Sequence, residues 1–238
     1  MDGIIGISGV IALLLVMGGG LALLRPSQFD GRWLVVAAML VLVNDAMLTN
    51  VYGLLPDVFR GSDWNWQGKI LALLATLAIA ALPAFGWKRS GLTWHQAAGS
   101  VKASLPVMLI YMGFFAILAW TFPSGPTSAE TIAFQLTMPG FEEELYYRGI
   151  LLFALDRAFL ARKSFLGVQW GWGAVLSCIL FGLAHAFGYS DGQFSFDSLT
   201  MALTAVPSII GVWLVLKTRS ALLPVVLHNF GNAITLIF

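Results

Sequence analysis

The sequence predicts an all-α membrane protein, a polytopic bundle of about eight transmembrane helices. Of its 238 residues, 58% are hydrophobic and only 11% are charged, whereas a soluble domain carries about 25% charged residues. The mean hydropathy is +0.83. Apolar runs recur that approach the roughly 20 residues a helix needs to cross a bilayer core of about 30 Å. In lipid, helices satisfy all their backbone polar groups internally, so a helical bundle is the expected architecture.

We expect a single membrane domain over residues 1–238, with four N-terminal spans in 1–127 and a second half, 128–238, that holds most of the buried polar residues. No Lys or Arg precedes the first apolar run, so we interpret it as a retained span, not a signal peptide. A Pro-Gly pair at 139–140 interrupts the long fifth span. The expected spans are residues 4–24, 33–55, 69–87, 105–122, 128–160, 172–187, 199–216 and 222–238.

Basic residues are distributed unevenly between the predicted loops. Arg60 and Lys69 border the loops after even-numbered spans, and Arg148 lies inside a span. The others hold or border the loops after odd-numbered spans: Arg25, Arg32, Lys88, Arg89, Lys102, Arg157, Arg162, Lys163, Lys217 and Arg219. By the positive-inside rule, this bias places the odd loops in the cytoplasm and both termini outside.

Composition also excludes several classes of function. No basic cluster exists that could hold a nucleic-acid backbone. Cys178 is the only cysteine, which excludes an intrachain disulfide and a cysteine-based metal cluster. We expect a multi-pass integral membrane protein, in the inner membrane of a prokaryotic cell, with lipid as its surroundings.

A small set of polar residues falls at membrane depth, where charge is costly and usually functional. Because each of these groups is unfavourable alone, we expect most of them to converge on one polar pocket. The set consists of Asn44, Asp45, Glu142, Glu143, Glu144, Arg148, His185, His228, Asn229 and Asn232.

Three consecutive glutamates open the most polar stretch. In an α-helix, Glu144 and Arg148 share one face as i,i+4 neighbours, and the arginine needs a carboxylate partner in lipid. Glu143 points about 100° away and has no obvious partner on its own helix. A desolvated carboxylate of this kind suits a general base. The structural alternative is that the glutamates only cap a helix start, and this is the interpretation we favour for Glu142.

Two later helices carry histidines. His185 follows Phe181 by one turn, so the phenyl ring could wall the imidazole. His228 and Asn232 share a face and could donate to a tetrahedral oxyanion. The alternative for this second pair is an interhelical clamp worth about 0.6 kcal/mol per hydrogen bond. Asn229 faces elsewhere, as a packing or clamp residue.

The remaining polar residues have weaker predictions. Asp45 is expected to play a structural pairing role, for which Arg148 is a candidate partner, or to be a second proton-handling group. His95 is expected to be an interfacial surface residue.

Three short motifs and a lead-in occur in a fixed order: Glu143-Glu144-x-x-x-Arg148, Phe181-x-x-x-His185, and His228-x-x-x-Asn232 preceded by Ser220-x-x-x-Pro224. This pattern resembles the CPBP family of intramembrane proteases, also called the type II CAAX prenyl endopeptidase or Abi family. The resemblance covers about residues 128–238. It implies a glutamate-dependent peptidase that cleaves a membrane-associated protein or peptide, such as a prenylated, leader or sorting-tail substrate.

The resemblance also implies roles for the motif residues. Glu143 would activate a water that His185 holds and orients. His228 and Asn232 would stabilise the oxyanion. Glu144, with Arg148, would lock the helix and orient His228.

Metal dependence and non-enzymatic roles are the open alternatives. A zinc ion could be bound by Glu143, Glu144, His185 and His228 with one open position, but no H-E-x-x-H motif is present. The resemblance favours the glutamate mechanism, so no cofactor is expected. A non-catalytic relative could act in bacteriocin immunity or as a scaffold. A proton-coupled transporter would also use buried Glu and His, but the chain has no internal repeat.

Overall fold

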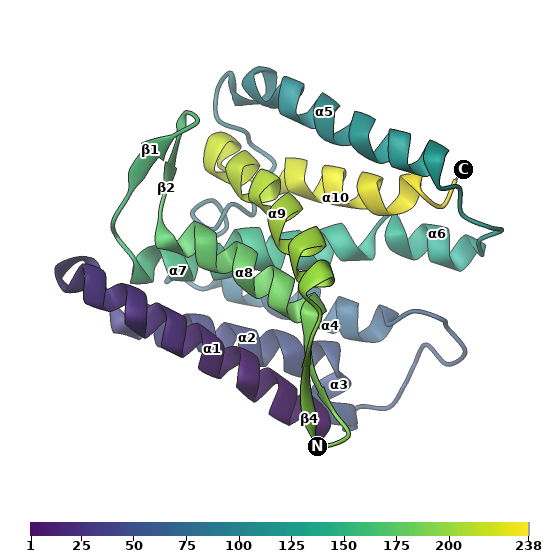
Figure 1. The fold of residues 1–238 in the computed structure, drawn as a ribbon, viewed down its shortest axis with the longest axis horizontal. Helices are drawn as coiled ribbons and strands as arrows, with labels where there is room; N and C mark the ends of the chain where they lie inside the picture. The colour runs from purple at the N-terminus through teal and green to yellow at the C-terminus, as the bar shows by residue number, and fades with distance from the viewer. Residues whose placement is uncertain (238) are drawn as a thin grey trace.

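The computed structural model describes residues 1–237 and consists mainly of helices (Figure 1). The helices are α1 (Asp2–Leu24), η1 (Pro26–Gln28), α2 (Gly31–Leu48), α3 (Asn50–Gly53), α4 (Trp66–Ala81), α5 (Ser100–Thr121), α6 (Ala129–Gln135), η2 (Gly140–Leu151), α7 (Leu152–Ala158), α8 (Trp172–Ala186), α9 (Ser198–Thr218) and α10 (Leu222–Ile234). The strands are β1 (Lys163–Phe165), β2 (Val168–Trp170), β3 (Phe187–Ser190) and β4 (Gln193–Phe196).

The segment η2 is a π-helix at the centre of the bundle. It packs against α2, α4, α8, α9 and α10. In Figure 1, α1 and α2 lie on one side of the molecule, α5 and α10 on the other, and α9 crosses between them. Tyr146, Ile150 and Leu151 of η2 are almost fully buried. The central position of η2 brings its polar side chains within reach of several other helices.

The predicted eight crossings are not confirmed. Four helices are long and apolar enough to cross a membrane: α1, α2, α5 and α9. Three further apolar helices, α4, α8 and α10, have 16, 15 and 13 residues. At 1.5 Å per residue, the last of these is about 20 Å long, shorter than a bilayer core of about 30 Å. Local backbone geometry shortens α2 as well, which ends at Leu48 before a left-handed stretch at residues 50–52, whereas the predicted span reached residue 55.

Two small antiparallel hairpins correct the all-α prediction. Strand β1 pairs with β2, and β3 pairs with β4. Both hairpins turn through two residues with positive φ, Leu166-Gly167 and Asp191-Gly192, which is the type I′ pattern that matches the strand twist. The Asp-Gly pair is a hairpin signal in the sequence. These hairpins lie in the connections between helices and leave the helical bundle intact.

The connections after the odd-numbered predicted spans meet at one end of the bundle. Asp30 N–H donates to the Ala158 carbonyl, Ala97 N–H to the Thr218 carbonyl, and Ala221 N–H to the Gly91 carbonyl. At the opposite end, the loop before α4 contacts α6, and Ser124 donates to the Thr235 carbonyl. The basic loops therefore share one end, as the charge bias requires. That this end is cytoplasmic stays a prediction.

Candidate active site

Close contact with α10 fixes the start of η2. The Gly140 N–H donates to Asn229 Oδ1 at 2.7 Å. A Cβ at Gly140 would lie 2.5 Å from Asn229 Oδ1 and 2.7 Å from the Val225 carbonyl oxygen, so only glycine allows this approach. The predicted clamp role of Asn229 is confirmed, and the clamp sets the register of the glutamates that follow.

The predicted pair of Glu144 and Arg148 is confirmed as a buried ion pair. Arg148 Nε lies 3.1 Å from Glu144 Oε2. The guanidinium also lies 4.4 Å from the centroid of the Phe181 ring on α8, within range of a cation–π interaction. The helix type differs from the α-helix we assumed, because η2 is a π-helix with i→i+5 hydrogen bonds. The expected 100° between neighbouring side chains therefore does not apply here.

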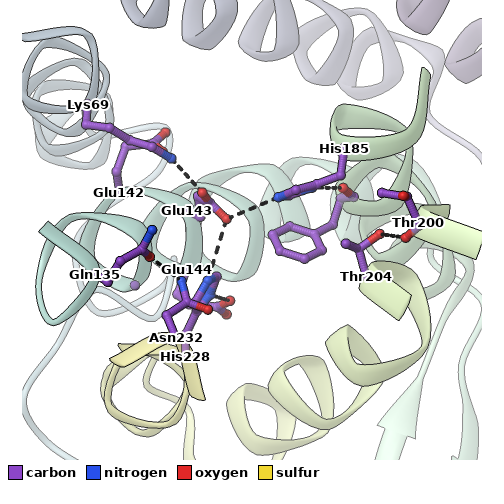
Figure 2. Close-up of polar contacts among 12 residues, drawn as sticks. Lys69, Gln135, Glu142, Glu143, Glu144, His185, Thr200, Thr204, His228 and Asn232 are labelled. Carbon is purple, nitrogen blue, oxygen red and sulfur yellow. Dashed lines mark hydrogen bonds and ion pairs between the residues drawn. The ribbon is translucent and has the colours of Figure 1, made fainter. Parts of the chain in front are cut away.

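The partner of Glu143 comes from another helix, and sequence analysis missed it. Lys69 Nζ on α4 lies 2.6 Å from Glu143 Oε1 and 2.6 Å from Glu142 Oε2 (Figure 2). The interpretation of Glu142 as an interfacial cap is wrong, since its side chain is fully buried and paired with this lysine. The missed signal was Asn65, whose side chain caps α4. The helix therefore begins at Trp66, and Lys69 lies within its first turn instead of at its border.

The two histidines approach the other oxygen of Glu143. His185 Nε2 lies 3.9 Å and His228 Nε2 3.8 Å from Glu143 Oε2. His185 Nδ1 is 2.8 Å from the Phe181 carbonyl. A carbonyl can only accept, so Nδ1 is the donor, and a neutral His185 presents Nε2 as an acceptor. The Phe181 ring lies 4.7 Å from the His185 ring, centroid to centroid, in the predicted walling position.

The carboxylate of Glu144 holds His228. Its Nδ1 lies 2.8 Å from Glu144 Oε1, so the ion pair of Glu144 with Arg148 continues into the imidazole. Asn232, one turn later, lines the same cavity and donates through Nδ2 to Gln135 Oε1 at 3.0 Å. Gln135, at the end of α6, is a second polar residue that sequence analysis missed.

Two of the remaining polar residues lie away from this cluster. Asp45 accepts a hydrogen bond from the Tyr52 hydroxyl at 3.2 Å. Among the described residues, no salt bridge joins it to Arg148, so that candidate pairing is wrong. His95 is exposed in the loop before α5, as expected of a surface residue.

A cavity of about 800 Å³ contains the cluster. Pockets of about 300–1,000 Å³ are typical of ligand sites. Glu143, His185, His228 and Asn232 line it together with Lys69, and the remaining walls come from α5, α6, α9 and α10. The site lies toward the end of the bundle opposite the basic loops, since Lys69 is in the first turn of α4 and His185 in the last turn of α8.

The contacts of these groups give no support to the zinc alternative. Among residues 1–237, no group of three or more His, Cys, Asp or Glu side chains converges in a way that could hold a metal ion. Two of the four residues considered as zinc ligands are committed to other partners, Glu144 to the arginine and to His228, and Glu143 to Lys69 through one oxygen. The polar side chains of the site can hold, orient and accept protons.

Comparison with known families supports the sequence motifs. Residues 125–234 match the family model described as type II CAAX prenyl endopeptidase Rce1-like, which confirms the resemblance predicted from the motifs. No protein with a curated description and no solved structure matches the chain. The match includes every motif residue, while Lys69 lies outside it.

Proposed function

Since residues 125–234 match the model of the type II CAAX prenyl endopeptidase Rce1-like family, we propose that the protein is an intramembrane endopeptidase. It hydrolyses a peptide bond of a membrane-associated protein or peptide. One observation carries this proposal. Glu143 Oε2 is buried, has no hydrogen-bond partner among the described residues, and faces two imidazole nitrogens at 3.9 and 3.8 Å.

The separations around Glu143 suit one water molecule. Both are longer than a direct hydrogen bond and correspond to polar groups bridged by water. Such a water donates one hydrogen to Glu143 Oε2 and the other to His185 Nε2. Its free lone pair then points into the cavity, toward a substrate carbonyl carbon. Glu143 acts as general base and His185 orients the nucleophile.

The reaction then follows from these positions. The water oxygen attacks the carbonyl carbon as its proton moves to Glu143. The tetrahedral intermediate collapses when the C–N bond breaks, and Glu143 returns the proton to the leaving amine. The products are one carboxylate and one ammonium group, since the proton of the new carboxylic acid passes to the amine.

In this proposal His228 and Asn232 stabilise the oxyanion by donating hydrogen bonds to it. Asn232 Nδ2 has two N–H groups, and Gln135 uses one of them. A protonated His228 donates through Nε2 while Nδ1 stays bonded to Glu144. Fixed donors of this kind stabilise charge that develops in the transition state. Glu144, itself held by Arg148, orients the imidazole.

The surroundings suggest the kind of substrate. The cavity lies among apolar helices and near the end opposite the basic loops, so it suits an extended peptide segment at the membrane. A prenylated, leader or sorting-tail sequence fits this description. We propose no cofactor, and we propose the inner membrane of a prokaryotic cell as the location, with both lipid and substrate as partners.

A comparison of protein fragments in cells tests the proposal. N- and C-terminal peptides would be quantified in membranes that contain wild type, Glu143→Gln, or the control Asp191→Asn in the β3–β4 turn. We expect a fragment that disappears only with Glu143→Gln. With that substrate and purified protein, kcat should fall about 10²–10⁴-fold, the usual contribution of a general base.

Opposite results would refute the assignment. Full activity of purified Glu143→Gln would show that Glu143 is not the base. Complementation of the cellular phenotype by a Glu143→Ala/His185→Ala double variant would favour a non-catalytic role in bacteriocin immunity or scaffolding.

A further inference from the structure

The strongest unassigned contact of the site comes from Lys69. Its Nζ lies 2.6 Å from an oxygen of each of two neighbouring carboxylates, those of Glu142 and Glu143. The lysine side chain is only 15% exposed, and the two carboxylate side chains are 1% and 13% exposed. Lys69 belongs to the N-terminal half of the chain, outside the matched residues 125–234.

The start of α4 is tied to α6, which fixes the position of this lysine. Trp64 Nε1 donates to Thr131 Oγ1 at 2.9 Å, and Trp66 Nε1 donates to Glu130 Oε1 at 3.0 Å. The Trp64 ring also stacks on Phe134 with centroids 4.8 Å apart. These contacts with α6 therefore hold in place the helix end that carries the Lys69 ammonium.

We infer that Lys69 is a positioning residue of the site, holding Glu142 and Glu143 together so that the free oxygen of Glu143 faces the two histidines. This inference rests on the proposed peptidase function. Lys69 engages Oε1 of Glu143, and Oε2 is the oxygen that lies 3.9 Å from His185 and 3.8 Å from His228 (Figure 2).

Electrostatics gives the lysine a specific task. Glu142 and Glu143 are sequence neighbours that share a poorly hydrated site, where like charges repel strongly. The charged and imidazole groups facing them are Glu144 and Arg148 on η2, His185 on α8 and His228 on α10. The phenols of Tyr146 and Tyr147 on η2 also lie near these carboxylates. Arg148 is already engaged by Glu144. Without the Lys69 ammonium, the two carboxylates would move apart. Oε2 of Glu143 would then no longer be held facing the two histidines.

Kinetics of purified protein test the inference. We compare Lys69→Met with Lys102→Met, which removes an exposed lysine at the start of α5. Lys69→Met should lower kcat about 10–100-fold, part of the full effect of losing a general base, and leave KM within about threefold, since misdirection weakens the transition state alone. Lys102→Met should keep wild-type values. A rise in KM at unchanged kcat would overturn the inference, because the lysine would then bind substrate.

Chemical rescue separates the charge from packing. The only native cysteine, Cys178, is buried, so Cys178→Ala/Lys69→Cys offers one reactive thiol on the cavity wall. Its thiolate displaces bromide from 2-bromoethylamine and forms a thioether that ends in an ammonium, with the reach of lysine. Alkylation with iodoacetamide adds a neutral group of similar size. Aminoethylation should restore at least about half of the lost kcat on a logarithmic scale, and carbamidomethylation should not. Equal rescue by both reagents would overturn the inference.

The proposed function is judged by a different variant. If Glu143→Gln retains activity, the proposed function fails. If Glu143→Gln is inactive but Lys69→Met behaves like Lys102→Met, only the inference about Lys69 fails. Should Lys69→Met not fold, Lys69→Gln replaces it in the same comparison, and the aminoethylated protein supplies the decisive value.

Discussion

Replacing Arg148 by methionine should lower the free energy of unfolding of the protein more than the removal of any other single charge in this region. Arg148 is 1% exposed, and its Nε lies 3.1 Å from Glu144 Oε2. Breaking a buried ion pair by removing one partner costs about 3–5 kcal/mol, because the other charge stays buried. His228 still contacts Glu144, which favours the lower end. The lost cation–π contact with Phe181 adds about 2 kcal/mol where the cation is desolvated. Together these terms give an expected loss of about 5 kcal/mol.

An arginine on the adjoining helix α7, Arg157, provides the control. Arg157 is exposed and stacks over the Trp33 ring at 5.0 Å, a contact worth about 0.5–1 kcal/mol at an exposed site. Unfolding in detergent micelles would be titrated with dodecyl sulfate and followed by tryptophan fluorescence. Arg148→Met should lose at least about 2 kcal/mol more than Arg157→Met. The double variant Arg148→Met/Glu144→Gln should recover most of that stability yet remain inactive, because His228 lacks its carboxylate. Equal losses for the two single variants would refute the reasoning.

Two further predictions concern stability. A methyl group at Gly9 of α1 would lie 2.8 Å from the Phe187 ring of the β3–β4 hairpin, so Gly9→Ala should cost about 1–3 kcal/mol by overpacking. Gly20→Ala on the same helix meets nothing within 4 Å and should cost nothing, and equal melting temperatures of the two variants would contradict this. Asn229→Ala removes the acceptor of the buried Gly140 N–H and should cost about 1–3 kcal/mol in the same titration. A loss below about 0.5 kcal/mol would show that the clamp does not hold η2.

The sequence predicted the residues of the site better than the bounds and types of the helices that carry them. Charged residues are so unfavourable in lipid that Glu143, Glu144, His185 and His228 had few alternatives to a common pocket. The structure brings them together, and the pair of Glu144 with Arg148 followed from their spacing. Their chemical roles stay predictions, which the variants above test.

The features that were missed depend on helix geometry that hydropathy does not record. An apolar run shows where lipid or protein surrounds a helix, but not how long the helix is. The predicted eighth span ran to residue 238, which lies outside the described residues, and α10 ends at Ile234. The third predicted span was expected to begin at residue 69. The cap at Asn65 instead starts α4 at Trp66, so Lys69 lies inside the helix. The choice between an α- and a π-helix at 140–151 also leaves no trace in the apolar pattern.

The charges of the cluster favour a protonated histidine during the proposed reaction. The three carboxylates of residues 142–144 face only two permanent cations within the cluster, Lys69 and Arg148. Three negative and two positive charges leave one negative charge in a buried site, where an unbalanced charge is costly. An imidazolium at His228 would cancel it, since this ring contacts Glu144 at 2.8 Å and faces Glu143 at 3.8 Å. Such an imidazolium is also the donor that the oxyanion needs. In the proposed reaction the three glutamates would therefore have different roles: Glu142 would pair with Lys69, Glu143 would serve as base while Lys69 holds its other oxygen, and Glu144 would keep His228 charged and in place.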